Sequence, residues 1–399
     1  MPHVRRRHAL QKLKKKLGFT RVLSIQGARQ TGKSFMAREI LPLELSAAHY
    51  ETFDQKKTRA FADSNPESFL KKFEFAHPLI IDEAQKVPDI FDAVKYEVDQ
   101  KPRPGRFVLL GSTEFSRESK IKESLTGRLS RLRLYPFNLA ESLGLSQNLS
   151  KQPFYLNEKP RVRRSELLRY LERGGFPGIF AVRERQEREA LLSDWLGLTL
   201  TRDLLQFAHL NPDPDLAEDL IREIPRASVP DATSLSRLID ADPRKVAKHL
   251  KLLEMLFVLH RLSPHPLGGG KPLYFLCDVG LAHFLGANFH RQLATWFLLE
   301  QLAQSSYRNE SAPRLSYYRS ARGGVLDFVM EDDKKGMAAI QIFSRESWDL
   351  RDFEIIKAFG KKWNQSQDAA GRIKLLVLAP VSDSESVEQV RLMPWESIA

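Results

Sequence analysis

The segment from Gly27 to Ser34 reads G-A-R-Q-T-G-K-S and fits the pattern G-x-x-x-x-G-K-[ST]. It follows an apolar stretch of strand length, residues 22–26, and precedes a segment with helical character, residues 34–40. A glycine-containing turn between a buried strand and a helix lets successive backbone N–H groups and the helix N-terminus face an anion. This context predicts an α/β domain that holds phosphate at the end of a strand.

Each part of this phosphate loop has a predicted role. We expect Lys33 to reach the β and γ phosphates of a nucleotide as a point charge, and the Ser34 hydroxyl to be a ligand of Mg²⁺. The predicted nucleotide-binding residues are Gly27, Ala28, Arg29, Gln30, Thr31, Gly32, Lys33 and Ser34. The motif therefore predicts binding of ATP together with Mg²⁺.

Two adjacent carboxylates, Asp82 and Glu83, follow the apolar stretch 79–81. Ligands of doubly wound sheets bind at the carboxyl ends of strands, so we expect Asp82 to lie near the Mg²⁺ and Glu83 to orient and deprotonate the attacking water. The alternative is that the pair caps a turn that begins at Ala84. Because the pair accompanies a phosphate loop, we favour hydrolysis.

Two further features have weaker signals. Gly111, Ser112 and Thr113 end a third apolar stretch, 107–110, and either sense the γ-phosphate or form a strand-end turn. Arg128 follows a predicted helix over 118–125 and is predicted to be an arginine finger, acting in cis or from a neighbouring subunit. An arginine finger from a neighbouring subunit is compatible with an oligomer.

Charge is unevenly spread along the 399 residues, a length that predicts two or three domains. The formal charge is +12, yet residues 1–38 hold eleven Lys and Arg with no Asp or Glu, so the remainder carries 51 minus 50, or +1. Residues 4–17 have the pattern of a basic amphipathic helix. We favour a solvated helix that lies on the next domain over a patch that meets nucleic acid or an anionic membrane.

The cysteine count and hydropathy exclude several classes. Cys277 is the single cysteine, which excludes an intramolecular disulfide and a Cys-based zinc site and is typical of a reducing compartment. No apolar stretch approaches the roughly 18 to 20 residues of a membrane span, and no secretory signal follows the N-terminal charges. We expect a cytoplasmic protein with no membrane partner.

Residues 211–286 have the pattern of a winged helix. A long helix is predicted from Pro243 with Asp242 as its N-cap, followed by a hairpin that pairs 257–262 with 273–277. Three glycines at 268–270 are expected to make a flexible tip. The basic side chains on the helix and wing are Lys245, Lys248, His249, Lys251 and Lys271. They are compatible with duplex DNA or with a protein partner.

Together the motifs resemble a bacterial and archaeal family of AAA-type ATPases that end in a C-terminal domain of unknown function. The resemblance spans nearly the whole chain, on residues 27–34, 80–85, 125–128, 135–137, 174–177, the helix that contains Asp203, 248–262 and 273–281. It implies ATP binding and hydrolysis, with Lys33, Ser34, Asp82 and Glu83 at the family's motif positions.

In that family the last region resembles a restriction-endonuclease-like core with a helix Glu, a strand Asp and a Glu-x-Lys. Glu300 and Asp327 match the first two, but the third position reads Gln341-Ile342-Phe343. An amide and a phenyl ring supply neither a hard oxygen ligand set for Mg²⁺ nor a cation, so we predict a domain without nuclease activity. The alternative is that Glu300 and Asp327 are surface carboxylates with no common site.

The predicted fold class is α/β, comprising a parallel P-loop NTPase sheet, a helical linker with a winged helix, and a restriction-endonuclease-like α/β domain. The predicted domains are the ATPase domain with its basic helix at 1–145, a connector at 146–210, a winged-helix-like domain at 211–286 and the nuclease-like domain at 287–399. We expect a nucleotide switch, an ATP hydrolase coupled to a C-terminal DNA- or protein-binding module. The alternative is a DNA-binding regulator that binds nucleotide and scarcely hydrolyses it.

Overall fold

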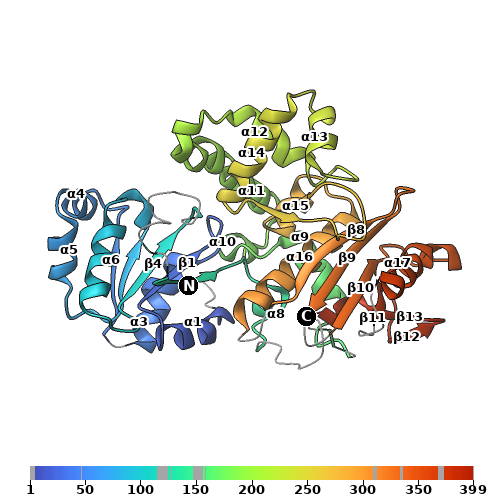
Figure 1. Ribbon diagram of the computed structural model, residues 1–399, viewed down its shortest axis with the longest axis horizontal. Helices are drawn as coiled ribbons and strands as arrows, with labels where there is room; N and C mark the ends of the chain where they lie inside the picture. Colours follow the sequence, from blue (N-terminus) through green and yellow to red (C-terminus); the bar gives the residue numbers. More distant parts are fainter. Residues whose placement is uncertain are drawn as a thin grey trace.

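The computed structural model describes residues 5–398 except 46, 115–124, 126, 147–155, 158, 309–311, 333–335 and 367–372. Three lobes are visible in Figure 1: an N-terminal α/β lobe at the left, a lobe of helices at the top and a C-terminal sheet lobe at the right. The helices labelled α9 and α16 lie between them. The α/β class predicted from the sequence is confirmed.

The N-terminal sheet is parallel throughout, in the order β2-β3-β4-β1-β5. Its strands are β1 (Val22–Gln26), β2 (His49–Thr52), β3 (Leu79–Asp82), β4 (Phe107–Gly111) and β5 (Leu129–Arg133). The three predicted apolar strands are confirmed, and each is buried along its length because helices cover both faces. Since β4 lies between β1 and β3, its end separates the phosphate loop from the acidic pair.

Short helices connect these strands. They are α1 (Ala9–Leu17), α2 (Lys33–Phe35), η1 (Met36–Ile40), α3 (Leu41–Glu44), α4 (Lys56–Ser64), α5 (Pro66–Lys72), η2 (Ala84–Lys86) and α6 (Ile90–Gln100). The helix after the phosphate loop is present as predicted, but its second part, η1, has π-helical hydrogen bonding. Such π-helical turns are frequent at functional sites.

The basic N-terminal helix α1 lies on the neighbouring parts of the fold. Its apolar residues Leu10, Leu13 and Leu17 share a core with Leu23 of β1 and Tyr307 of the C-terminal half. The favoured interpretation, a helix that lies on the next domain, is confirmed. Several of its cations serve internal contacts: the Nζ atom of Lys16 donates to Ser130, and that of Lys12 donates to the carbonyl of Arg308.

The helical lobe follows the first sheet. Its elements are α8 (Leu139–Ser142), α9 (Arg164–Arg173), α10 (Pro177–Phe180), α11 (Arg185–Leu198), η5 (Thr199–Asp203), η6 (Leu204–Leu210), α12 (Pro214–Glu223), α13 (Ala232–Leu238), α14 (Pro243–Met255), β6 (Leu259–Leu262), β7 (Leu273–Leu276) and α15 (Val279–Phe284). One apolar core runs from Phe176 to Ala287. Asp242 caps α14 as predicted, because its carboxylate accepts from the N–H groups of Arg244 and Lys245 at 2.8 and 3.0 Å.

The C-terminal lobe is a six-stranded mixed sheet in the order β12-β13-β11-β10-β9-β8. Its elements are α16 (Phe289–Tyr307), β8 (Arg314–Arg319), β9 (Val325–Asp332), β10 (Gly336–Ile342), η7 (Leu350–Phe353), α17 (Glu354–Ser366), β11 (Ile373–Ala379), β12 (Glu385–Val387), β13 (Val390–Pro394) and η8 (Trp395–Ile398). Residues of α16 pack on one face of this sheet and residues of α17 on the other. The predicted second α/β unit is therefore present.

The tip of the β6–β7 hairpin corrects a prediction. The glycines at 268–270 do not form a free, flexible tip, because they pack against β8. A Cβ on Gly268 would lie 2.8 Å from the ring of Tyr318, and one on Gly270 would lie 2.3 Å from the hydroxyl of Tyr317. Glycine is needed at positions 268 and 270 for close approach, so the β6–β7 hairpin packs against the C-terminal sheet. In the described part of the chain, no helix is both long and apolar enough to cross a membrane.

Candidate functional site

The phosphate loop begins where β1 ends and is shaped by its two glycines. A Cβ on Gly27 would lie 2.1 Å from the carbonyl oxygen of Leu134, so a side chain does not fit there. Gly32 has a φ of +88°, in the left-handed region that only glycine adopts at little cost. These two constraints explain the glycine positions of the motif in physical terms.

Lys33 is buried beneath the loop that it belongs to. Its Nζ atom donates to the carbonyl oxygens of Gly27 and Ala28, each at 2.8 Å. Burial lowers the pKa of Lys33 to about 8, although the carboxylates of Glu83 and Asp82 oppose this shift. The ammonium is thus held at the loop by two neutral acceptors, which a phosphate oxygen can replace with a stronger, charged one.

Asp82 is the last residue of β3 and is 2% exposed. One carboxylate oxygen accepts from the Tyr50 hydroxyl at 2.7 Å, and the other accepts from the N–H of Glu83 at 2.9 Å. Tyr50 lies on β2, the strand next to β3. These two donors fix the orientation of the carboxylate.

Glu83 has an unusual backbone conformation, with a φ of +54°. Residues other than glycine that adopt this region concentrate at functional sites. Although Glu83 precedes the short helix η2, its side chain makes no capping hydrogen bond, so the alternative role as a helix cap is wrong. Its carboxylate accepts from Gln85 Nε2 at 2.5 Å. Burial raises the pKa of Glu83, and the nearby Asp82 raises it further.

One cavity of about 510 Å³ brings several of the predicted groups together, although Asp82 is not part of its lining. Lys33, Ser34 and Glu83 line it, as does Ser112 from the end of β4. Residues 177 and 178 at the start of α10 also line it. This volume is typical of small-molecule sites. Within the segment 111–113, Ser112 lines this cavity, and its role at a ligand stays a prediction.

Arg29 joins the phosphate loop to the helical lobe. Its guanidinium makes a two-pronged ion pair with Asp203 of η5, with N–O distances of 2.6 and 2.5 Å. In addition, the indole N–H of Trp195 donates to the backbone carbonyl of Arg29 at 3.3 Å. The hydrogen bond with Asp203 is the main reason that the pKa of Arg29 is raised. The helix of Asp203 is part of the family resemblance, but the sequence does not indicate that Asp203 pairs with Arg29, 174 residues earlier in the chain.

Arg128 lies away from this cavity. It precedes the first residue of β5, whereas the last residue, Arg133, is in register with Gln26 beside the phosphate loop. Five residues of strand separate these sheet edges by about 16 Å. The guanidinium pairs with Asp99 at 2.5 and 2.8 Å. The cis form of the arginine-finger prediction is therefore corrected, and the form with a neighbouring subunit stays a prediction. Thr126 and residues 118–124 of the predicted helix lie outside the described residues.

The two carboxylates assigned to a nuclease-like centre do not meet. Glu300 is buried and accepts from Gln304 Nε2 at 3.1 Å, and burial raises its pKa to about 7. Asp327 instead pairs with His290 Nε2 at 3.1 Å and accepts from the N–H of Ile342 at 2.8 Å.

His290 and Glu300 are ten residues apart on α16, a rise of about 15 Å. The match of Glu300 and Asp327 to one centre is therefore corrected. The alternative of two surface carboxylates is also wrong for Glu300, which is 1% exposed. Within the described ranges, no group of three or more His, Cys, Asp or Glu side chains is arranged to hold a metal ion.

Two parts of the chain match known domain families. Residues 20–143 match a family described as an AAA domain, and residues 164–292 match a domain of unknown function. Uncharacterized proteins of Mycobacterium bovis and Mycobacterium tuberculosis are each 27% identical over 345 residues, covering 82% of this chain and 71% of theirs. A solved structure, the Walker-type ATPase of Pyrococcus abyssi, aligns with a TM-score of 0.40 and 15% identity over 69% of this chain and 93% of its own.

The AAA match contains the phosphate loop, the acidic pair and the whole parallel sheet. The second match covers most of the helical lobe and the hairpin, including Asp203. Residues 20–143 are therefore similar to an AAA domain and contain the phosphate loop, and residues 164–292 are similar to a domain of unknown function.

Proposed function

We propose that this protein is a Mg²⁺-dependent ATPase that acts as a nucleotide switch. The observation that carries the proposal is the convergence of Lys33, Ser34 and Glu83 on one cavity of about 510 Å³. Lys33 supplies positive charge to the phosphates, and the loop supplies backbone N–H groups. Glu83 orients the attacking water and accepts its proton. Burial raises the pKa of Glu83 towards the working pH, which makes it a better base once deprotonated.

The residues present fit a magnesium ion bound with the nucleotide. The Ser34 hydroxyl and the Asp82 carboxylate are hard oxygen donors, which Mg²⁺ prefers. Each oxygen of Asp82 accepts one hydrogen bond, from Tyr50 or from Glu83, and keeps a further lone pair. When bound, Mg²⁺ neutralises charge on the phosphate oxygens.

The ion pair between Arg29 and Asp203 supports a coupling between nucleotide and helical lobe. A bound triphosphate competes with Asp203 for the Arg29 guanidinium, because both are anions that accept paired N–H groups. Asp203 is 3% exposed within η5, which continues directly from α11. Loss of this pair frees η5 from the phosphate loop. The nucleotide state is thereby transmitted to the domain of unknown function.

The partner of the switch is proposed to be duplex DNA bound at α14. Arg244, Lys245, Lys248 and Lys251 are exposed on this helix. His249, predicted to belong to the same basic face, is instead buried: its Nε2 accepts from the N–H of Asp213 at 2.8 Å. A salt-dependent complex with DNA and faster ATP turnover in its presence would support this partner. No stimulation by DNA would favour a protein partner.

Nucleotide binding tests the first half of the proposal. The full-length chain is titrated with a fluorescent ATP analogue in the presence of Mg²⁺, alongside a Lys33→Ala variant. We expect saturable binding by the wild type and a loss of at least about tenfold in affinity for the variant, because one charge-assisted contact is removed. Equal binding by the two proteins would contradict the assignment of the phosphate site.

A further inference from the structure

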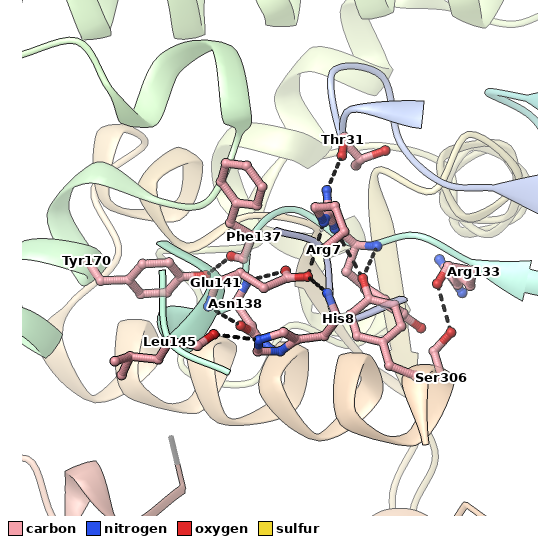
Figure 2. A network of polar contacts seen from close by, with 12 residues as sticks. Arg7, His8, Thr31, Arg133, Phe137, Asn138, Glu141, Leu145, Tyr170 and Ser306 are labelled. Carbon is pink, nitrogen blue, oxygen red and sulfur yellow. Dashed lines mark hydrogen bonds and ion pairs between the residues drawn. The ribbon is translucent and has the colours of Figure 1, made fainter. Parts of the chain in front are cut away.

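Arg7 lies in the N-terminal segment, outside the residues that match the AAA domain, yet its side chain is almost completely buried against the phosphate loop. Figure 2 shows the guanidinium at the centre of a polar network. Its Nη1 donates to the carbonyl of Thr31 at 2.7 Å, and its Nε pairs with Glu141 of α8 at 3.1 Å. Its Nη2 donates to the carbonyl of Tyr135 at 2.6 Å and to the Tyr307 hydroxyl at 3.2 Å.

The surroundings hold this guanidinium in one orientation. Glu141 is fully buried, and the oxygen that pairs with Arg7 also accepts from the N–H of His8 at 2.7 Å. The Tyr307 hydroxyl accepts from the N–H of Tyr135 at 3.0 Å as well. The ring of Phe137 stacks beneath the guanidinium, 4.9 Å from its central carbon. A planar fork with several fixed acceptors has little freedom to rotate.

The contact with Thr31 determines how the phosphate loop presents its backbone. In a trans peptide, the carbonyl of one residue and the N–H of the next point in opposite directions. Because Arg7 holds the Thr31 carbonyl, the N–H of Gly32 points away from Arg7, from the opposite edge of the peptide unit. Gly32 and Lys33 line the nucleotide cavity, and Arg7 lies at its wall as well. Backbone N–H groups of such loops are what bind phosphate oxygens.

We propose that Arg7 is a positioning residue of the nucleotide site: it fixes the Thr31–Gly32 peptide for phosphate binding and joins that peptide to Tyr307 of α16. The inference rests on the proposed nucleotide binding. It gives the N-terminal segment a role that its basic composition does not indicate, since this cation serves the loop and not an external partner. It also provides a direct path from the phosphate loop to the helix that packs on the C-terminal sheet.

The test compares Arg7→Lys with Arg6→Lys in the full-length chain. Arg6 is exposed, so the second variant is a matched control for the same chemical change. Lysine keeps the charge but offers its donors from a single atom, and it does not reach four acceptors at once. We expect Arg7→Lys to raise the Kd for a fluorescent ATP analogue roughly tenfold, and Arg6→Lys to leave it within about twofold.

A split between KM and kcat separates positioning from general damage. We expect the KM for ATP to rise with the Kd in Arg7→Lys, while kcat stays within about threefold of the wild type because Glu83 is untouched. A folded Arg7→Lys protein that binds nucleotide as the wild type does would overturn the proposal. A loss of kcat in Arg7→Lys as large as the expected rise in KM, with KM itself unchanged, would also overturn the proposal.

Two more variants keep the result interpretable. Tyr307→Phe retains the ring and removes one acceptor of Arg7, so we expect a rise in Kd of about threefold even if Arg7→Lys fails to fold. In that event, wild-type binding by Tyr307→Phe would overturn the inference. Lys33→Ala is the reference for the loss of specific nucleotide binding. If its Kd for the ATP analogue equals that of the wild type, the proposed function fails together with the inference. If Lys33→Ala loses binding and Arg7→Lys keeps the Kd of the wild type, the inference alone fails.

Discussion

Replacing Asp203 with asparagine should lower the free energy of unfolding of the nucleotide-free protein and raise its affinity for nucleotide. The carboxylate makes two short contacts with Arg29 of the phosphate loop, at 2.6 and 2.5 Å. Asparagine has nearly the same shape but no charge, and it keeps a single acceptor oxygen. The variant therefore tests whether this ion pair links the loop to η5 and competes with the phosphates.

The size of the effect follows from the exposure of the pair. At an effective dielectric constant of about 20, charges about 4 Å apart attract by about 4 kcal/mol. The side chain of Asp203 alone is 4% exposed and that of Arg29 is 22% exposed, so solvent screens one partner, and the asparagine oxygen retains part of the interaction. We expect a loss of about 2 kcal/mol in the free energy of unfolding without nucleotide. We expect the Kd for ATP to fall about fivefold to tenfold, because a competing anion is removed.

Urea unfolding without nucleotide and titration with a fluorescent ATP analogue measure the two effects. Asp194→Asn is the matched control, because it removes the same charge from an exposed position on α11. The two effects of Asp203→Asn have opposite signs, which general damage to the fold does not produce. Unchanged stability combined with weaker nucleotide binding would refute the reasoning.

Three other predictions concern separate parts of the molecule. Nucleotide affinity should fall as the pH rises from 7 to 9, because burial lowers the pKa of Lys33 to about 8 and its charged fraction decreases over this range. An affinity of the wild type that does not change with pH, or an equal fall in Lys33→Arg, would contradict this. Gly268→Val should lower the free energy of unfolding by about 1–3 kcal/mol, since a Cβ there meets Tyr318 and Arg319, whereas Gly269→Val should be nearly neutral in the same urea titration because nothing lies within 4 Å of its Cβ position. Arg128→Ala should leave nucleotide binding unchanged. If Arg128 acts from a neighbouring subunit, ATP turnover per molecule should rise with protein concentration in the wild type, and Arg128→Ala should lower this rise. Turnover equal to that of the wild type at every protein concentration would contradict that role.

The local signals of the sequence predicted the centre of the candidate site. Buried parallel strands are continuous apolar runs, so β1, β3 and β4 are recognisable from their residues alone. The phosphate loop and the acidic pair are short motifs whose function depends on spacing. Because both follow such strands, their meeting at one sheet edge follows from the parallel topology.

What the sequence did not predict depends on contacts between distant residues. Strand β2 has the polar sequence H-Y-E-T at a sheet edge and lacks an apolar run, so Tyr50 gave no signal. Arg7 lies in a basic run typical of a solvated surface, and its partner Glu141 is 134 residues away. The prediction for the three glycines at 268–270 is also wrong, because the lack of a side chain permits both a flexible loop and close packing, and the sequence alone does not distinguish the two.

Steady-state ATP turnover of Glu83→Gln tests the central claim most directly. Glutamine retains the size and polarity of Glu83 but does not accept a proton from water, so binding and hydrolysis are separated in one variant. Glu74→Gln, at an exposed position far from the cavity lining, is the control. We predict that Glu83→Gln binds the ATP analogue within about threefold of the wild type and loses at least about a hundredfold in kcat. Turnover at the wild-type rate by Glu83→Gln would contradict the account.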